Sequence, residues 1–275
     1  MTIFLGTAGI PRDAQGLGTT EGIKTCARLG LNAMEIEFVQ QVYMKPEAAR
    51  EAGAAAKEAG VRLSIHAPFY INLLSDKKET IAASKKRILD SADRAEIMGA
   101  DAIAIHTAFY GKMSSGEATE KLAEEYGDIL DKMRSAGIKN VKLGAETMAR
   151  ESQWGTLDEV LQLHKKTHGK TIPYIDWAHL FARGGSKMDY EEILQKLHRT
   201  GIRHINSHFE GMKFDAKKKK HVDVHVPIGE PPFEPLAKLL VKKKTDITLI
   251  CESPDPQGDA LKMKRMIEKE GYRFK

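Results

Sequence analysis

The sequence contains few cysteines and no long apolar segment. Only two cysteines, Cys26 and Cys251, occur in 275 residues, which excludes a disulfide framework and a zinc site built from thiolates. No apolar run approaches the ~20 residues that a membrane-spanning helix needs. Residues 1–6 lead directly into a strand pattern, without the basic region, apolar segment and cleavage site of an export signal. We therefore expect a cytoplasmic protein without a membrane partner.

The bulk composition is that of a globular protein. Hydrophobic residues make up 41% of the chain and charged residues 29%. A chain of this length can form one α/β barrel, so we expect a single domain over residues 1–275 and a monomer. The formal net charge of +5 is compatible with a polyanionic partner, although Lys/Glu-rich surfaces also serve stability.

Two repeating patterns indicate alternating strands and helices. Helix-like segments repeatedly end at a glycine, which takes the left-handed cap conformation without steric cost and is followed by a β-rich run. Helical patterns are clearest at 80–99, 156–166 and 189–199, and the second begins with Thr156 three residues before Glu159, the spacing of a capping box. We expect eight strands, at about 3–7, 33–38, 62–66, 102–106, 141–146, 172–176, 203–208 and 247–252.

Eight strands alternating with helices predict a (β/α)₈ TIM barrel. A doubly wound open sheet is the alternative, but no glycine-rich dinucleotide turn follows the first strand. Alternation within the runs also favours the barrel. Leu63 and Ile65 share one face of their strand, whereas Ser64 and His66 share the other. Strands with an apolar outer face and a polar inner face fit a barrel that has its site at the carboxyl ends of the strands.

Six of the predicted strands end in residues that can bind a metal ion. They are His66, His106, Glu146, Asp176, His208 and Glu252. Two further pairs follow closely, Asp176 with His179 and Asp223 with His225, the latter in a loop after the basic run 217–220. Five imidazoles and four carboxylates suit zinc or manganese. Nine ligands exceed the needs of one tetrahedral ion and would hold two or three. Such a cluster leaves a net positive pocket that attracts a phosphodiester and can activate water for its hydrolysis.

Each residue taken alone has a simpler explanation. A strand-end histidine more often makes a structural hydrogen bond than binds a metal, and Lys217–Lys220 and Lys242–Lys244 more often form a solvated surface than contact phosphate. The joint occurrence of histidines and carboxylates at several strand ends favours the metal site. Glu35 and Glu37 share the inward face of the second strand, where Glu37 lines the pocket or forms an interior ion pair. Cys251 should face the helices as a small hydrophobe.

Seven segments together resemble the endonuclease IV family of apurinic/apyrimidinic endonucleases, whose barrel is of the xylose isomerase type. They are SIHAPFYINL, AIHTAFYG, LGAETMA, IDWAHLFAR, INSHFEGM, VDVHVPIGE and ICESP. The resemblance implies a trinuclear zinc site and incision of DNA on the 5′ side of abasic sites in base excision repair. It also implies catalytic roles for Glu146, Asp176 and Glu252.

The resemblance further implies how the ligands divide among the three ions. His66, His106 and Glu146 would hold one ion. Glu146 would bridge to a second held by Asp176, His208 and Glu252, and His179, Asp223 and His225 would hold the third. The residues that follow the strand-three histidine, Phe69, Tyr70 and Asn72, would contact double-stranded DNA at the flipped-out nucleotide.

The chain departs from the better-known bacterial pattern in two places. Residues 38–43, FVQQVY, lack the basic residue that bacterial members insert into the duplex, and His208 is followed by Phe209-Glu210-Gly211 instead of Leu-Asn-Asp. Two alternative functions remain. A sugar isomerase or epimerase on the same barrel needs one or two ions and fewer histidines, and a non-catalytic nucleic-acid-binding relative would have lost ligands that this chain retains.

Overall fold

A computed structural model describes residues 1–274, and at its centre eight parallel strands close into a barrel, as predicted. The chain therefore has the (β/α)₈ TIM barrel fold. The barrel strands are β1 (Ile3–Ala8), β2 (Ala33–Glu37), β3 (Arg62–His66), β4 (Ala102–Ile105), β6 (Lys142–Glu146), β8 (Thr171–Asp176), β9 (His204–Phe209) and β12 (Asp246–Cys251). Strand β1 pairs with both β2 and β12, which closes the sheet. Every strand end lies within one residue of its predicted position.

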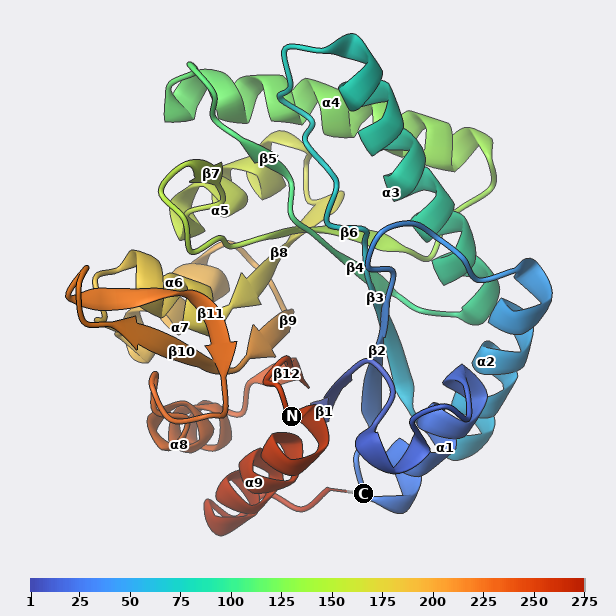
Figure 1. Cartoon of the computed structure of the whole chain (residues 1–275), viewed down its shortest axis with the longest axis vertical. Helices are drawn as coiled ribbons and strands as arrows, with labels where there is room; N and C mark the ends of the chain where they lie inside the picture. The colour runs from blue at the N-terminus through green and yellow to red at the C-terminus, as the bar shows by residue number, and fades with distance from the viewer. Residues whose placement is uncertain (275) are drawn as a thin grey trace.

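Helices surround the strands on all sides (Figure 1). They are α1 (Thr19–Arg28), α2 (Pro46–Ala59), α3 (Lys78–Met98), α4 (Ser115–Ser135), α5 (Leu157–Lys166), α6 (Trp177–Arg183), α7 (Tyr190–Arg199), α8 (Glu234–Lys243) and α9 (Pro256–Lys269), with a 3₁₀ turn η1 (Arg12–Ala14) before α1. The capping box predicted from Thr156 and Glu159 starts α5, and Gly60 and Gly99 end α2 and α3 in the left-handed conformation. Within the described residues, no helix combines the length and the apolarity that crossing a membrane requires.

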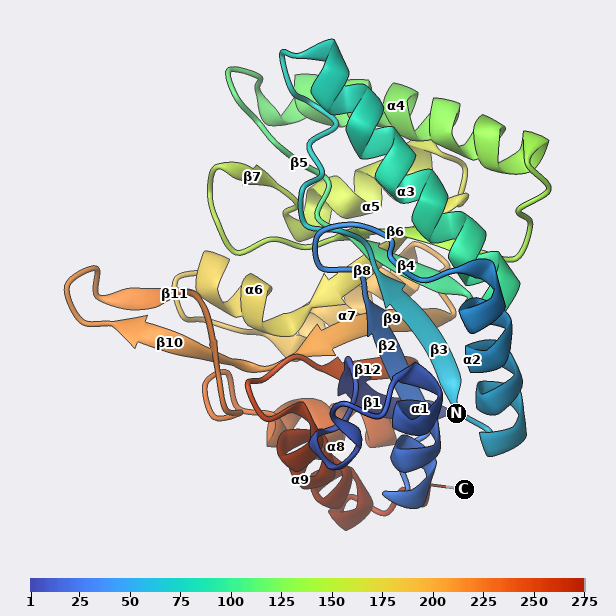
Figure 2. The same cartoon turned by 45° about the vertical axis from the view of Figure 1, so that its right-hand side comes forward.

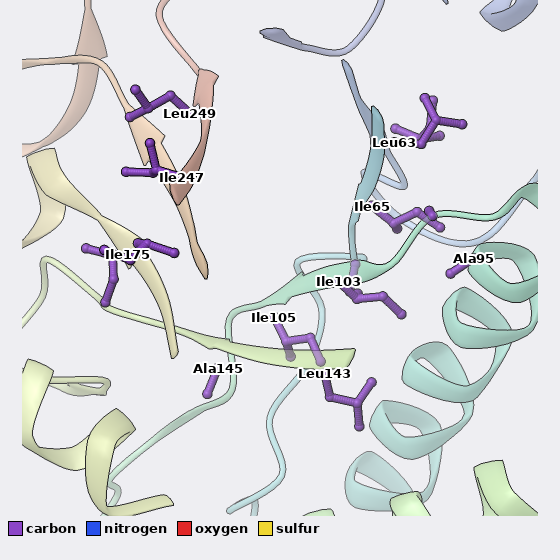
Figure 3. Packing of buried hydrophobic residues seen from close by; sticks show 14 of the residues in the cluster. Leu63, Ile65, Ala95, Ile103, Ile105, Leu143, Ala145, Ile175, Ile247 and Leu249 are labelled. Atoms are coloured by element: carbon purple, nitrogen blue, oxygen red, sulfur yellow. The ribbon is translucent and has the colours of Figure 1, made fainter. Parts of the chain in front are cut away.

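The hydrophobic core lies between the outer face of the barrel and the helices. Figure 3 shows Leu63 and Ile65 of β3 and Ile103 of β4 directed toward Ala95 of α3. Cys251 is also fully buried in this layer, as predicted, and burial raises the pKa of its thiol to about 12. The inner face carries small or polar residues, and a Cβ at Gly144 would come within 2.8 Å of the Tyr174 ring. This arrangement reserves the barrel interior for polar side chains.

Two antiparallel ribbons extend the mouth of the barrel. One is short, joining β5 (Ala108–Phe109) to β7 (Gln153–Trp154). The other is a hairpin of β10 (Gly211–Asp215) and β11 (Lys220–Val226), which projects from the barrel in Figures 1 and 2. The expectation of a loop at Asp223 and His225 was therefore wrong, because both residues lie on β11. The hairpin turn consists of Ala216 and three lysines, and it lacks the Asn-Gly or Asp-Gly pair that predicts a tight turn in a sequence.

Candidate metal centre

All nine residues singled out in the sequence surround the carboxyl end of the barrel. Parallel strands end on the same side, so ligands at their last residues gather there. His66, Glu146 and Asp176 end β3, β6 and β8, whereas His106 and Glu252 directly follow β4 and β12. The remaining four come from β9 (His208), the first turn of α6 (His179) and β11 (Asp223 and His225).

Glu146 lies at the centre of the cluster. Its Oε2 is 3.3 Å from Nε2 of His66 and 3.2 Å from Nε2 of His106. Its Oε1 is 3.4 Å from Nδ1 of His208 and 3.5 Å from Nδ1 of His179. The carboxylate is fully buried, and its Oε2 has no hydrogen-bond partner within residues 1–274. Each oxygen of Glu146 thus faces a different pair of imidazoles.

His208 faces three carboxylates with one nitrogen and a fourth with the other. Its Nδ1 lies 3.4 Å from Glu146, 3.5 Å from Glu252 and 4.0 Å from Asp176. Its Nε2 lies 2.7 Å from Oε1 of Glu35. Oδ1 of Asp176 caps α6 by accepting from the backbone N–H of His179, which leaves its buried Oδ2 without a partner in the described chain.

A third group joins α6 to the hairpin. Nε2 of His179 is 3.5 Å from Oδ1 of Asp223, and Nε2 of His225 is 3.9 Å from the same oxygen. Glu210, which the sequence analysis noted only as a departure from a family pattern, also belongs here. Its Oε1 is 3.8 Å from Nε2 of His225. The signal that could have found it is its spacing, because it comes two residues after His208, just past the end of β9, and side chains two apart along an extended segment face the same way.

Three of the five histidines place Nδ1 on a backbone carbonyl and direct Nε2 at carboxylates. Nδ1 of His66, His179 and His225 lies 2.8, 2.9 and 3.2 Å from the backbone carbonyls of Ala67, Thr147 and Glu252. A carbonyl can only accept, so these nitrogens donate and a neutral ring keeps its lone pair on Nε2. Metal-binding histidines show this arrangement, since the second hydrogen bond fixes tautomer and orientation.

The electrostatics of the cluster also fit a cation. Burial disfavours the imidazolium of His66, but the hydrogen bond and the charge of neighbouring carboxylates outweigh it and raise the pKa to about 10. The nearby His179 imidazole, with Nε2 3.5 Å from Oδ1, lowers the pKa of Asp223 to about 2. Burial raises the pKa of Glu37 to about 8, and its Oε1 has no partner among the described residues. The pocket thus crowds carboxylates whose ionisation a bound cation would favour, and bare oxygens and lone pairs suit divalent ions.

The two inward glutamates of β2 have different surroundings. Glu35 forms the interior pair with His208, and its Oε2 also accepts hydrogen bonds from Ser64 and Tyr174, both at 2.7 Å. Glu37 lines the pocket, where its carboxylate groups with those of Glu35 and Glu252.

The three residues expected to contact DNA follow β3 on the rim of the mouth. The side chains of Phe69 and Tyr70 are 44% and 55% exposed, and their ring centroids lie 4.1 Å apart. The Asn72 side chain is partly committed to the loop, because its Oδ1 accepts from the backbone N–H groups of Leu74 and Phe109. Of these three side chains, only the two aromatic rings are therefore free to contact a ligand at the rim.

The rim also collects the exposed apolar side chains of the molecule. Of the nine large hydrophobic residues exposed in the described chain, all except Met1 lie on segments that follow barrel strands: Leu17, Val39, Tyr43, Phe69, Tyr70, Phe109, Phe214 and Val224. A neighbouring cavity of about 790 Å³ lies between the hairpin and the segment after β6, and Arg150, Lys213 and Lys218 line it. The mouth thus combines stacking surfaces with positive charge.

Comparison with known proteins identifies the family. Residues 23–270 match the model of the xylose isomerase-like TIM barrel family. The chain belongs to this family. An uncharacterized protein of Methanocaldococcus jannaschii is 33% identical over 273 residues and covers 95% of both chains. A probable endonuclease 4 of Mycobacterium tuberculosis is 22% identical over 241 residues, 86% of this chain and 90% of that protein.

Solved structures with the same fold have names that denote different activities. Endonuclease IV from Thermus thermophilus superimposes with a TM-score of 0.72 at 16% identity, covering 98% of this chain and 100% of that one. A D-tagatose 3-epimerase-like protein gives a TM-score of 0.71 at 18% identity, covering 98% and 97%. At these identities the superpositions establish the fold alone, so function has to be argued from the site.

Proposed function

We propose that this protein is a metal-dependent endonuclease that hydrolyses the phosphodiester bond on the 5′ side of abasic sites in duplex DNA. One observation carries the proposal. Nine ligand-type side chains from separate strands and loops converge on one mouth, with bare imidazole nitrogens and carboxylate oxygens facing one another. A sugar isomerase or epimerase would use Glu146, Asp176, His208 and Glu252 around one ion. The other four histidines of the cluster would then have no role in the reaction.

Three divalent cations would fit this ligand set, with zinc expected and manganese possible. His66, His106 and Glu146 would hold the first. Glu146, Asp176, His208 and Glu252 would hold the second, and His179, Asp223 and His225 the third. Bound there, the ions would supply Lewis acidity toward the phosphate and lower the pKa of water. Glu146, Asp176 and Glu252 are the proposed catalytic residues, because their carboxylates converge on Nδ1 of His208, at 3.4, 4.0 and 3.5 Å.

The rim supports a nucleic-acid substrate. Phe69 and Tyr70 offer two exposed rings on which a base or unpaired nucleotide can stack once it leaves the helix. The hairpin carries the third-group residues Asp223 and His225 on β11 and lysines in the turn before it, so a phosphate chain lying along it would lead into the pocket. A free sugar would need neither feature.

An incision assay on a duplex oligonucleotide with one abasic analogue tests the proposal. We expect cleavage 5′ of the analogue by protein loaded with zinc or manganese, and loss of cleavage after chelation or in Glu146→Gln. Intact substrate with loaded protein at several temperatures would contradict the proposal. Interconversion of free ketoses and aldoses by the same preparation would favour the isomerase instead.

A further inference from the structure

Glu210 is the most isolated acidic side chain in the barrel mouth. It follows β9 directly, is fully buried, and neither carboxylate oxygen has a hydrogen-bond partner in the described part of the chain. Burying an unpaired carboxylate costs several kcal/mol as an order of magnitude. A residue placed this way requires either a proton or a cation that the surrounding side chains do not provide.

The surroundings of Glu210 point to a cation. One ligand atom each from Glu210, His179 and His225 lie within 4.8 Å of one another. Both imidazoles direct Nε2 into this space, because their Nδ1 atoms are occupied by the carbonyls of Thr147 and Glu252. Oδ1 of Asp223 approaches the same two nitrogens, at 3.5 and 3.9 Å.

These separations suit ligands of one ion better than hydrogen bonds between the side chains. Oε1 of Glu210 lies 3.8 Å from Nε2 of His225, which is too long for a hydrogen bond. Two ligand atoms at about 2.0–2.2 Å from a tetrahedral ion lie about 3.3–3.6 Å apart. A small contraction around a cation would bring Glu210, His179, Asp223 and His225 to that spacing.

We propose that Glu210 is a fourth protein ligand of the third cation, which makes that site a set of two histidines and two carboxylates. The two negative charges would balance one divalent ion, and the second carboxylate favours a harder ion such as Mn²⁺ more than a site rich in imidazole does. The inference rests on the metal centre of the proposed function but not on its DNA substrate.

Metal binding by Glu210→Gln provides the test, because glutamine keeps the size of the side chain and removes its charge. Chelator-stripped protein is titrated with MnCl₂ or ZnCl₂, bound ions are counted by elemental analysis after gel filtration, and affinities are measured calorimetrically. We expect Glu210→Gln to lose one ion, or to bind one ion at least tenfold more weakly. The metal-induced rise in Tm should shrink, while the Tm of the metal-free protein should not fall, because the neutral amide is less costly to bury than an unpaired carboxylate.

Two further variants assign the loss to a particular ion. His225→Gln should lose the same ion, so the double variant Glu210→Gln/His225→Gln should lose no more than either single variant. His66→Gln should lose a different ion, and its loss should add to that of Glu210→Gln. If Glu210→Gln does not fold, Glu210→Asn is measured in the same way.

If the Glu210 variants bind the same number of ions with the same affinities as the wild type, the inference is overturned. The buried carboxyl of Glu210 would then be protonated instead of bound to a cation. Wild-type protein that binds no ion would overturn both the inference and the proposed metal centre. Wild-type protein that binds three ions without cutting DNA would contradict only the nuclease proposal. The ligand role of Glu210 would then still be decided by the ion count.

Discussion

At the residue scale, the orientation of His208 depends on Glu35. The carboxylate lies 2.7 Å from Nε2 and is held by Ser64 and Tyr174, so the ring presents Nδ1 to Glu146, Asp176 and Glu252. Such partners of ligating histidines typically contribute 10–100-fold to metal affinity. Glu35 is thus expected to act as a positioning residue.

We expect Glu35→Gln to weaken metal binding at the His208 site by about 10–100-fold, because an amide holds the imidazole N–H less strongly than a carboxylate does. Competition with a chromophoric chelator measures the change. Tyr174→Phe is the matched control, since it removes one hydrogen bond to Glu35 but leaves the contact with His208. Equal effects of the two variants would indicate a general disturbance of the barrel interior.

Phe69 and Tyr70 allow a separate prediction on the substrate. Stacking of one base on an aromatic ring contributes about 1–3 kcal/mol, and both rings are exposed at the rim. We expect Phe69→Ala or Tyr70→Ala to weaken binding of abasic DNA more than binding of intact duplex, as measured by fluorescence anisotropy with chelator present. Equal losses of affinity for both duplexes would indicate that the rings contribute to packing and not to recognition of the abasic site.

The sequence predicted the positions of individual side chains at the mouth better than the contacts between them. His66 and Glu146 could be identified because each ends an apolar run, which fixes its direction. The pair of His208 and Glu35 joins residues that are 173 positions apart, and only the closure of the barrel brings them together. Glu210 went unassigned because a glutamate after a strand usually faces solvent, and its burial depends on the hairpin that follows.

At the scale of elements, the β10–β11 hairpin combines the proposed metal ligands Asp223 and His225 with a lysine-rich turn. The barrel strands were predictable from runs of apolar residues between glycine caps, whereas lysines 217–220 suggested an unstructured surface. Lys217 and Lys218 lie in the turn and line the cavity next to the mouth. A phosphate backbone entering the site would meet them.

We expect Lys217→Ala/Lys218→Ala to weaken DNA binding and to reduce its salt dependence. Each lost phosphate contact should lower the slope of log K against log salt by about 0.9. Lys238→Ala/Lys242→Ala is the matched control, because these exposed lysines lie on α8, away from the cavity. Binding isotherms at several salt concentrations measure both, and a similar change in the two double variants would contradict a specific role of the hairpin.

At the scale of the whole molecule, the barrel is polar at both ends, with different chemistry at each. Carboxylates and imidazoles crowd the mouth, whereas Arg62 and His204 meet at the amino-terminal ends of β3 and β9. Nη1 of Arg62 is 2.8 Å from Nε2 of His204, which also contacts Thr248 at 2.9 Å. The guanidinium can only donate, so His204 accepts and is neutral in the fold.

This second polar end gives the fold a pH dependence separate from that of the metal centre. Burial, followed by the charge of Arg62, lowers the pKa of His204 to about 4, although Asp246 opposes the shift. In the unfolded chain the pKa is about 6.5, so below that value the unfolded state binds a proton that the folded state does not. Stability from this group is complete above pH 6.5 and is lost as the pH falls toward 4.

Urea unfolding of the metal-free protein at pH 7, 5.5 and 4.5 measures the effect. We expect the free energy of unfolding of the wild type to fall across this range more steeply than that of His204→Gln, whose amide can still contact Arg62 and Thr248 but does not titrate. The carboxylates of the mouth contribute equally to both proteins, so the difference between the two curves isolates His204. Parallel curves would show that His204 titrates normally, and the acid sensitivity of the barrel would then originate at its mouth.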